Sequence, residues 1–281
     1  MMRRITCVIV ATVLAITVAA VPASAAVPAS AAQAGGTRYY LALGDSLAFG
    51  TQPTHVPGQG YVDQLYATLH ATRPALALAN LGCPGETSRS LRVGGTCPYP
   101  DGRSQLDTAL AFLRAHPRAV DLITIDIGAN DVNGCVTASA IDAACVQRGL
   151  VTIALNLSVT VARLRFAAPH ARIAGMTYYD PTLAAWLAGP AGQALARDSL
   201  PMLHRLNRLL TFIYLAGDFR VADVAGAFAT DDMTTLVGGV PLDVVRICQW
   251  TWMCAPRPLG PDIHANQDGY GVIARAFAAV L

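Results

Sequence analysis

Four short segments of the chain carry residue types suited to nucleophilic chemistry. Gly44-Asp45-Ser46 follows an apolar run and places a serine hydroxyl where a strand should turn into a helix. Such a turn presents the hydroxyl together with the backbone N–H groups that begin the helix. The serine could therefore attack a carbonyl carbon, although Asp and Ser are also ordinary helix caps.

The other three segments could supply hydrogen-bond donors and a base. Gly85 lies in a Cys-Pro-Gly-Glu-Thr sequence, and a glycine lets backbone N–H groups approach a ligand closely. Asn130, in Gly-Ala-Asn-Asp, carries a side-chain amide that could donate to a developing oxyanion. His264 precedes the last helical pattern and could accept the proton of a serine. Each residue alone is equally typical of an ordinary turn.

Alternating strand and helix patterns would bring these segments together. Apolar runs predict strands, and apolar residues three and four apart predict helices. The expected strands are residues 39–43, 76–81, 120–127, 172–177 and 219–224, and the expected helices contain residues 62–69, 106–113, 150–164, 203–213 and 270–280. The strands lack polar alternation, so both sheet faces should be covered. We therefore expect an α/β fold, a flavodoxin-like three-layer α/β/α arrangement around a central parallel sheet.

Ligands of such sheets bind beyond the carboxyl ends of the strands. The segments of Ser46, Gly85 and Asn130 should lie at this edge, and His264 could reach it. Asp45 and Asp131 are interpreted as hydrogen-bonding residues that brace the turns. Residues 230–260 lack a regular pattern and are expected to form a long loop. Trp250 and Trp252 in this loop could line an acyl pocket or a lid, or pack on the core. The remaining histidines are interpreted as surface or structural residues: His55, His70, His116, His170 and His204.

The N-terminus has the features of a secretory signal peptide. Arg3 and Arg4 precede an apolar stretch, and Ala-Ser-Ala triplets end at residues 25 and 31. The stretch is shorter than the roughly 20 residues of a membrane-spanning helix, which favours a cleaved leader over an anchor. We expect a signal peptide in residues 1–25 with cleavage as late as residue 31, a flexible leader in 26–37, and a single domain in 38–281. The protein should then be secreted.

Charge and hydropathy narrow the range of partners. Removal of Arg3 and Arg4 takes the formal net charge from +2 to 0, so a basic face for nucleic acid is not expected. No segment after the signal peptide is expected to be long and apolar enough to span a bilayer. We expect a monomer without a stable membrane anchor.

The cysteines favour disulfides over a metal site. Of the seven cysteines, Cys7 lies in the expected signal peptide, and an even number remains. An even number in an exported chain indicates disulfides, although sequence alone leaves many pairings open. Nearest-neighbour pairing gives Cys83–Cys97, Cys135–Cys145 and Cys248–Cys254. The cysteine and histidine spacings are not those of a zinc site, so no metal is expected.

Taken in order, the four segments resemble the SGNH hydrolase family, also known as GDSL esterases and lipases. The family's four defining residues match Ser46, Gly85, Asn130 and His264, and the resemblance extends from residue 41 to residue 270. It implies a carboxylic ester hydrolase that forms an acyl-enzyme on Ser46 with His264 as base, and that needs no cofactor. Its oxyanion hole would comprise Ser46, Gly85 and Asn130, and its partner would be a small-molecule or lipid ester. The Cys-Pro-Gly-Glu-Thr and Asp-Ile-His-Ala-Asn sequences look like the secreted actinobacterial branch.

One departure from the family pattern concerns the residue that orients the histidine. The family commonly has an aspartate three residues before the histidine, where this chain has Pro261. Asp262, two residues before, could take that role and complete a triad. Alternatively the backbone carbonyl of Pro261 could accept the ring N–H and leave a dyad. In either case an acceptor must fix the tautomer of His264.

Three alternatives to a general esterase or lipase remain open from sequence. The chain could be a carbohydrate O-acetyl esterase or a phospholipase of the same family. It could be a catalytically silent binding protein on the same fold. A flavodoxin-like cofactor binder is a third possibility, but such a protein has no need of Ser46, Asn130 and His264 in these positions.

Overall fold

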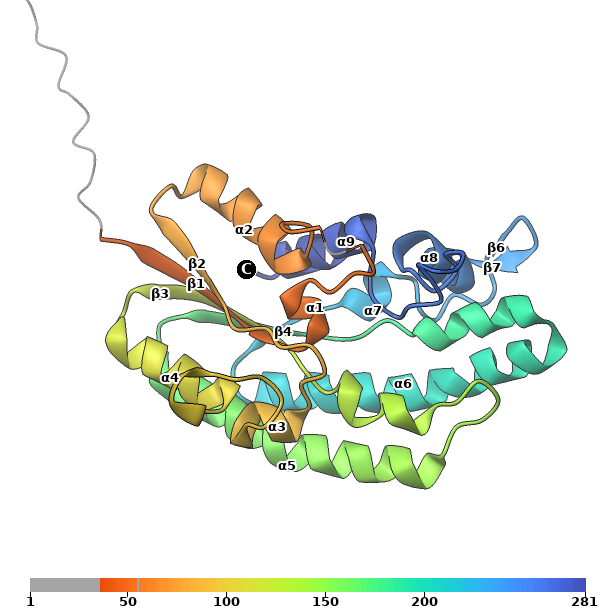
Figure 1. Ribbon diagram of the computed structural model, residues 1–281, viewed down its shortest axis with the longest axis horizontal. Helices are drawn as coiled ribbons and strands as arrows, with labels where there is room; N and C mark the ends of the chain where they lie inside the picture. The colour runs from red at the N-terminus through yellow and green to blue at the C-terminus, as the bar shows by residue number, and fades with distance from the viewer. Residues whose placement is uncertain (1–35, 55) are drawn as a thin grey trace, which may run out of the picture. The chain divides into compact units, whose positions relative to one another are not determined.

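A five-stranded parallel sheet forms the centre of the computed structural model, which describes residues 36–54 and 56–281. The strand order is β2-β1-β3-β4-β5. Figure 1 labels the first four strands of this sheet along the chain, β1 to β4. The strands are β1 (Arg38–Gly44), β2 (Leu76–Asn80), β3 (Val120–Asp126), β4 (Arg172–Met176) and β5 (Arg220–Ala222). All neighbouring strands run parallel. The expected signal peptide, residues 26–35 of the expected leader, and His55 lie outside the described residues.

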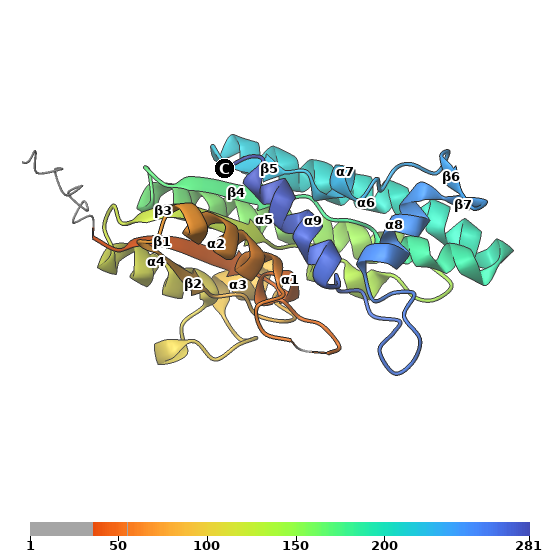
Figure 2. The same ribbon diagram turned by 90° about the horizontal axis from the view of Figure 1, so that it is seen from above.

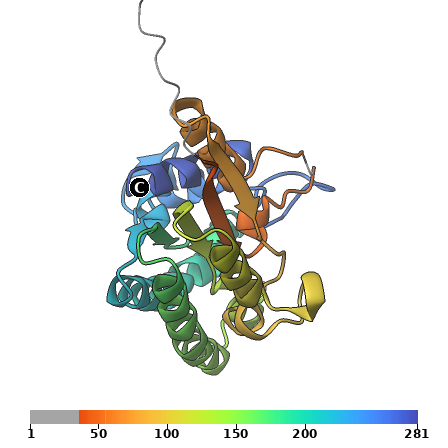
Figure 3. The same cartoon turned by 90° about the vertical axis from the view of Figure 1, so that its left-hand side faces the viewer.

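Helices cover both faces of the sheet, as the end-on view makes clear (Figure 3). One layer contains α2 (Tyr61–Thr72), α7 (Val224–Ala227), α8 (Leu242–Trp250) and α9 (Gln267–Ala278). The other contains α3 (Ser88–Val93), α4 (Gln105–Ala115), α5 (Ala143–Ala167) and α6 (Pro190–Ala216). Within the first layer α2 and α9 lie side by side over the sheet (Figure 2). The expected three-layer α/β/α fold is confirmed.

Short elements at the carboxyl ends of the strands build the connections. A single turn, α1 (Ser46–Phe49), follows β1. The 3₁₀ segments are η1 (Pro100–Gly102), η2 (Ala129–Asp131), η3 (Asn133–Cys135) and η4 (Pro181–Ala188). A small antiparallel hairpin joins β6 (Leu236–Val237) to β7 (Val240–Pro241).

Burial explains why the strands read as continuous apolar runs. In β1 every residue from Tyr40 to Gly44 is buried, because helices cover both faces of the sheet. Side-chain caps mark where several helices begin. Thr87 forms a capping box with Ser90 at α3, and Asn266 accepts from the backbone N–H of Gly269 at α9.

The expectation of a long loop over residues 230–260 is wrong. This segment contains the β6–β7 hairpin and α8. Gly238 and Gly239 form the hairpin turn at φ of 60° and 84°, values typical of a two-residue turn between strands. Helix α8 is only nine residues long and buries Val244 and Ile247, so its apolar periodicity is too short to stand out.

The expectation that no later segment is long and apolar enough to cross a bilayer is also wrong. Among the described residues, α5 meets that criterion by length and composition: it has 25 residues, and an 18-residue window within it has a mean hydropathy of 1.4. Its hydropathy is high because exposed Val151, Leu155 and Phe166 add to a buried face. That buried face, which includes Ile153 and Leu157, contributes to the core, and the helix contacts α3, α4 and α6.

Candidate active site

Ser46, His264 and Asp262 form a continuous hydrogen-bonded chain at the carboxyl edge of the sheet. The Nε2 atom of His264 lies 2.9 Å from Oγ of Ser46. Its Nδ1 atom lies 2.7 Å from Oδ1 of Asp262. Asp262, and not the carbonyl of Pro261, is therefore the acceptor beside the ring. A hydroxyl, an imidazole and a carboxylate in this order can transfer a proton away from the hydroxyl.

A turn within the histidine loop explains how Asp262 reaches the ring from two residues away. Oδ1 of Asp262 also accepts from the backbone N–H of His264 at 2.9 Å. This side-chain-to-backbone bond to the second residue along is an Asx turn. The turn folds the carboxylate back over the histidine, so a spacing of two suffices.

The end of α8 and the residues after it pair with the loop that carries His264. The backbone N–H of Trp252 donates to the carbonyl of His264 at 3.0 Å, and the backbone N–H of Asn266 donates to the carbonyl of Trp250 at 3.0 Å. Thr251 and Ala265 form an antiparallel bridge between these contacts. The Cys248–Cys254 disulfide encloses the same segment. The ring of Trp250 packs on Phe228 with centroids 5.1 Å apart, which agrees with the core-packing interpretation of this residue.

Ser46 is positioned by the tight exit of β1. Gly44 has a φ of +144°, and a Cβ atom there would overlap oxygen atoms of Asp126. The side chain of Gln105 pairs with both backbone groups of Gly44, at 2.7 Å to its N–H and 2.9 Å to its carbonyl. Asp45 caps α1 by accepting from the N–H of Leu47 at 2.9 Å. The first N–H of this turn, that of Ser46, has no partner within the helix.

Two buried carboxyl groups lie beneath Ser46. Asp45 accepts from the hydroxyl of Tyr178 at 3.0 Å, and Asp126 accepts from Tyr61 at 2.5 Å and from the N–H of Ala48 at 3.2 Å. Burial, reinforced by the charge of Asp45, raises the pKa of Asp126 well above its usual range. Burial also raises the pKa of Asp45. Both carboxyl groups therefore brace the turn, as expected for Asp45.

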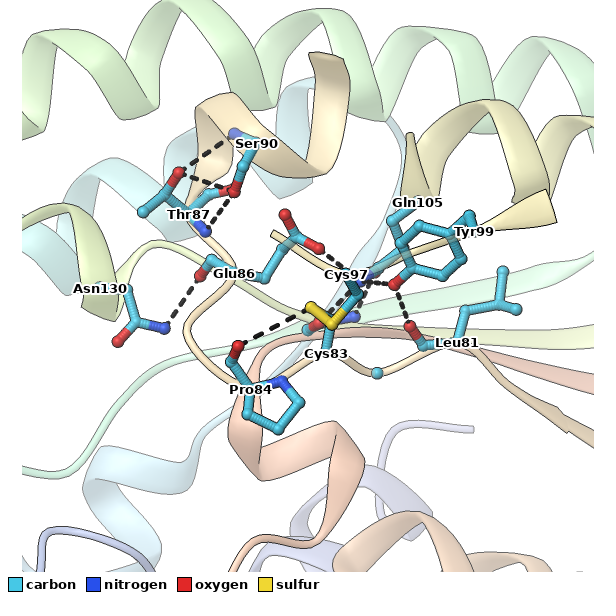
Figure 4. The surroundings of a disulfide bond; sticks show 12 residues. Leu81, Cys83, Pro84, Glu86, Thr87, Ser90, Cys97, Tyr99, Gln105 and Asn130 are labelled. Carbon is cyan, nitrogen blue, oxygen red and sulfur yellow. Dashed lines mark hydrogen bonds between the residues drawn. A yellow bond between two sulfur atoms is a disulfide. The ribbon is translucent and has the colours of Figure 1, made fainter. Parts of the chain in front are cut away.

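Asn130 points towards the glycine-bearing loop between β2 and α3 (Figure 4). Its Nδ2 donates to the carbonyl of Glu86 at 2.9 Å, and the amide has a second N–H that this bond does not use. Gly85 precedes Glu86 in a turn closed by Glu86 N–H to Cys83 carbonyl at 3.1 Å. Its φ of +80° suits glycine at the third position of such a turn. The hydrogen bond that closes this turn does not involve the backbone N–H of Gly85.

Further contacts join the two loops to each other and to the helices. Both oxygens of Asp131 accept from Ser88, one from the backbone N–H and one from the hydroxyl, each at 2.7 Å. Asp131 thus braces its turn, as expected from the sequence. The Cys83–Cys97 disulfide begins two residues before Gly85, and Cys135–Cys145 ties η3 to the start of α5. The three disulfides of the structure are the nearest-neighbour pairs.

A cavity of about 580 Å³ opens beside Ser46. Ser46, Asn130 and His264 line it, whereas Gly85 is exposed and does not. The cavity extends along η4 and the first half of α6, and its volume is typical of a site for a small organic ligand. Within the described residues no group of His, Cys, Asp or Glu has an arrangement that could hold a metal ion.

Several residues around the site carried little or no signal in the sequence. Gln105 lies inside a helical pattern and gives no hint that it brackets Gly44. Tyr178 and Tyr179 follow β4, where the carboxyl-edge rule could have suggested them. Tyr179 donates to the carbonyl of Ile263 at 2.8 Å and so holds the histidine loop from the sheet side. Of the other histidines, His204 forms an exposed hydrogen bond with Asp231 and does not line the cavity beside Ser46.

Residues 42–272 match the model of the GDSL-like lipase/acylhydrolase family. No curated protein matches the chain. An extracellular lipase from Streptomyces rimosus is similar in structure, with a TM-score of 0.57, 17% identity, and coverage of 87% of this chain and 100% of the lipase. A catalytic mutant of an acetylxylan esterase from Geobacillus stearothermophilus is also similar, with a TM-score of 0.55, 19% identity, and coverage of 88% of this chain and 94% of the esterase. At these identities the two structures show a shared fold.

Proposed function

The chain belongs to the GDSL-like lipase/acylhydrolase family, and we propose that it hydrolyses carboxylic esters through an acyl-enzyme on Ser46. The observation that carries this proposal is the chain of contacts from Ser46 Oγ to His264 Nε2 at 2.9 Å and from Nδ1 to Asp262 at 2.7 Å. These residues lie far apart along the chain, and the sequence predicts a catalytic role for each of them. Their meeting at one edge of the sheet is what nucleophilic catalysis requires.

The first half of the reaction is acyl transfer to the enzyme. Asp262 accepts the Nδ1–H of His264, which leaves Nε2 as an acceptor for the Ser46 hydroxyl proton. As that proton moves to His264, Oγ forms a bond to the ester carbonyl carbon. The intermediate then collapses, the bond to the alcohol oxygen breaks, and His264 returns its proton to the departing alcohol.

The developing oxyanion needs donors that are already in place. The backbone N–H groups of Ser46 and Gly85 and the unused N–H of Asn130 are the proposed donors. Support comes from the bond between Asn130 and Glu86, which couples the orientation of the amide to the loop that carries Gly85. Donors fixed in this way lower the barrier without reorganising during the reaction.

The second half of the reaction releases the acid. Water loses a proton to His264 and attacks the acyl carbon, and the proton then passes to Oγ of Ser46 as the ester bond to the enzyme breaks. The products are one carboxylic acid and one alcohol, and the side chains return to their starting state. Every proton transfer uses the His264 ring held by Asp262.

We also propose that the protein is secreted, with a signal peptide in residues 1–25 and a single catalytic domain in 38–281. Three disulfides support an oxidising compartment. The basic and apolar start of the chain supports export. The Cys-Pro-Gly-Glu-Thr sequence around Gly85 supports a place in the secreted actinobacterial branch of the family.

The proposal is tested by Ser46→Ala, with Ser158→Ala as a matched control on the exposed face of α5. Wild type and Ser158→Ala should hydrolyse p-nitrophenyl butyrate and become labelled by a fluorophosphonate probe. Ser46→Ala should lose at least about 10⁴-fold in kcat and remain unlabelled, because the nucleophile is gone. Circular dichroism and Tm should show that the fold is kept. Ester hydrolysis that survives in Ser46→Ala would rule out the proposed mechanism.

A further inference from the structure

The outer side of α5 exposes a stripe of apolar side chains. Val151, Leu155 and Val159 follow one another at every fourth position and are 49%, 68% and 41% exposed. Phe166 is 90% exposed and lies about 60° around the helix axis from Val151, within the same arc. Scattered apolar side chains are ordinary on a protein surface, whereas a contiguous stripe marks a surface that binds a partner.

The outer side of α6 extends this stripe. Phe212 and Leu215 are 71% and 61% exposed, and they lie on the same side of α6 as the exposed Arg205 and Arg208. Val151 of α5 and both arginines of α6 line one hollow of about 330 Å³. The outer sides of α5 and α6 therefore form one continuous surface, which we call the α5–α6 face. In Figure 3 this face lies on the side of the sheet away from α9, with α5 in green and α9 in blue.

Positive charge is concentrated in the layer that carries this face. Its helices α3, α4, α5 and α6 contain nine arginines and two aspartates. The helices of the opposite layer, α2, α7, α8 and α9, contain two arginines and three aspartates, and none of these fully described helices exposes a large apolar side chain. Helix α5 alone has three arginines and no acidic residue in 25 positions. A net charge near zero thus conceals a cationic and apolar side of the molecule.

Three arginines of the α5–α6 face are available to an anion. Arg148 lies about one turn before Val151 on the outer side of α5. Arg148, Arg205 and Arg208 are exposed, and within the described residues none of them forms an ion pair. The side chain of Arg205 donates to the uncharged Gln147. A guanidinium matches the oxygens of a phosphate with two parallel hydrogen bonds. Arginines beside an exposed apolar stripe are typical of helices that lie in the plane of an anionic lipid surface.

We propose that the α5–α6 face docks on a bilayer that contains anionic phospholipids. The arginines bind the phosphates, and the apolar side chains enter the boundary between headgroups and acyl chains. Helix α5 lies along the surface over roughly 37 Å and does not cross the bilayer, because its other side, with Ile153 and Leu157, belongs to the core. This inference goes beyond the proposed function, since docking uses no residue of the Ser46 site.

The charge and the apolar stripe together argue against two other occupants of this face. A second copy of the chain in a symmetric dimer would bring the arginines of the face close to the same arginines of its partner, and their repulsion would oppose the contact. A nucleic acid would leave the apolar side chains without a partner, because it is contacted mainly at its phosphates and sugars. A bilayer with anionic headgroups satisfies both kinds of side chain.

The first experiment measures binding of the Ser46→Ala protein to vesicles by co-sedimentation, so that hydrolysis cannot change the lipids. Vesicles of phosphatidylglycerol and phosphatidylcholine in equal parts should bind the protein, and vesicles of phosphatidylcholine alone should bind it at least about tenfold more weakly. Raising NaCl from about 0.05 M to about 0.5 M should weaken binding to the anionic vesicles at least about fivefold, because salt screens the attraction between arginine and phosphate.

The second experiment changes the α5–α6 face in the same background. Arg148→Gln combined with Arg208→Gln should weaken binding to the anionic vesicles about 20- to 30-fold, at about fivefold for each arginine. Leu155→Ser combined with Phe212→Ser should weaken it about tenfold or more, because less apolar surface enters the bilayer.

A matched control combines Leu236→Ser on β6 with Arg275→Gln on α9, both exposed and outside the face, and should bind like the parent protein. Every variant keeps the same N-terminus, so any contribution of residues 1–35 to binding is common to all of them. With Ser46 restored, each variant should hydrolyse soluble p-nitrophenyl butyrate like wild type, which shows that the fold is kept.

Docking is supported by salt-sensitive binding to the anionic vesicles that the changes in the face weaken and the control does not. The absence of such binding, equal binding to both kinds of vesicle, or equal losses in face and control variants would overturn the inference. So would capture of polyglutamate without binding to vesicles, which would indicate an acidic protein partner. The lipid and salt dependence of the parent protein decides the matter even if a face variant does not fold. Hydrolysis that is independent of Ser46 would overturn the proposed function and leave docking intact.

Discussion

Asp262→Asn tests whether the histidine is held by a charge or by an oxygen in the right place. Oδ1 of Asp262 accepts two bonds, from Nδ1 of His264 at 2.7 Å and from the backbone N–H of the same residue at 2.9 Å. A backbone N–H can only donate. It should therefore make the side-chain amide of the variant present its oxygen and not its NH₂ group. The tautomer of His264 would then be preserved.

The expected loss is therefore that of the charge alone. A hydrogen bond to a charged group contributes about 1.5–3 kcal/mol, compared with about 0.5–1.5 kcal/mol for a neutral one. The difference of about 1–2 kcal/mol corresponds to roughly a 5- to 30-fold lower kcat. The Asp262 side chain is 32% exposed, so solvent screening favours the lower end of this range.

The assay compares kcat for p-nitrophenyl butyrate in Asp262→Asn, Asp262→Ala and His264→Ala. Asp262→Ala removes the acceptor as well as the charge and should lose about another tenfold or more. His264→Ala removes the base and should lose at least about 10⁴-fold. If Asp262→Asn were as inactive as His264→Ala, the argument that the backbone N–H fixes the amide would be refuted. If Asp262→Ala matched Asp262→Asn, the acceptor would have to be another group.

Two further predictions concern the oxyanion donors and a buried acid. Asn130→Ala should lower kcat about 10²- to 10³-fold with little change in KM, since its amide would act in the transition state, and a large change in KM alone would contradict that role. Burial and the neighbouring carboxylates raise the pKa of Asp243 to about 6, so the folded protein holds this proton longer than the unfolded chain. The stability that the protonated group contributes is full below about pH 4 and is lost as the pH rises through about 6. Asp243→Asn should remove about 1–2 kcal/mol of this pH dependence, and Tm curves between pH 4.5 and 7.5 that stayed parallel to wild type would contradict the assignment.

The sheet and the site segments were predictable because their signals are local. Each strand is an apolar run that ends at a turn, and parallel topology then places those turns on one edge. Ser46, Gly85 and Asn130 follow three such strands. His264 could be added because it precedes a helix whose apolar spacing is clear.

The remaining features depend on contacts between segments distant in sequence. Gln105 pairs with Gly44 across 61 positions, and no local pattern predicts that bond. The cavity depends on η4, whose alanines give no periodic signal of their own. It also depends on the first half of α6, which begins at Pro190, well before the leucine pattern that indicated the helix. Helix α8 gave no clear pattern for a different reason: it is only nine residues long and buries few of them.

The three disulfides suggest how an edge built from irregular loops can keep a fixed geometry. Cys83–Cys97 holds the loop of Gly85. Cys135–Cys145 begins on η3, directly after the η2 segment that carries Asn130. Cys248–Cys254 encloses the residues that pair with the His264 loop. Ring closures of this size each stabilise a fold by about 2–3 kcal/mol in the chain-entropy model. Loops without them would sample many conformations, and proton transfer over 2.9 Å would lose its alignment in most of them. Covalent closure adds to the packing of these loops, in which Cys83, Cys135 and Ala265 are themselves buried.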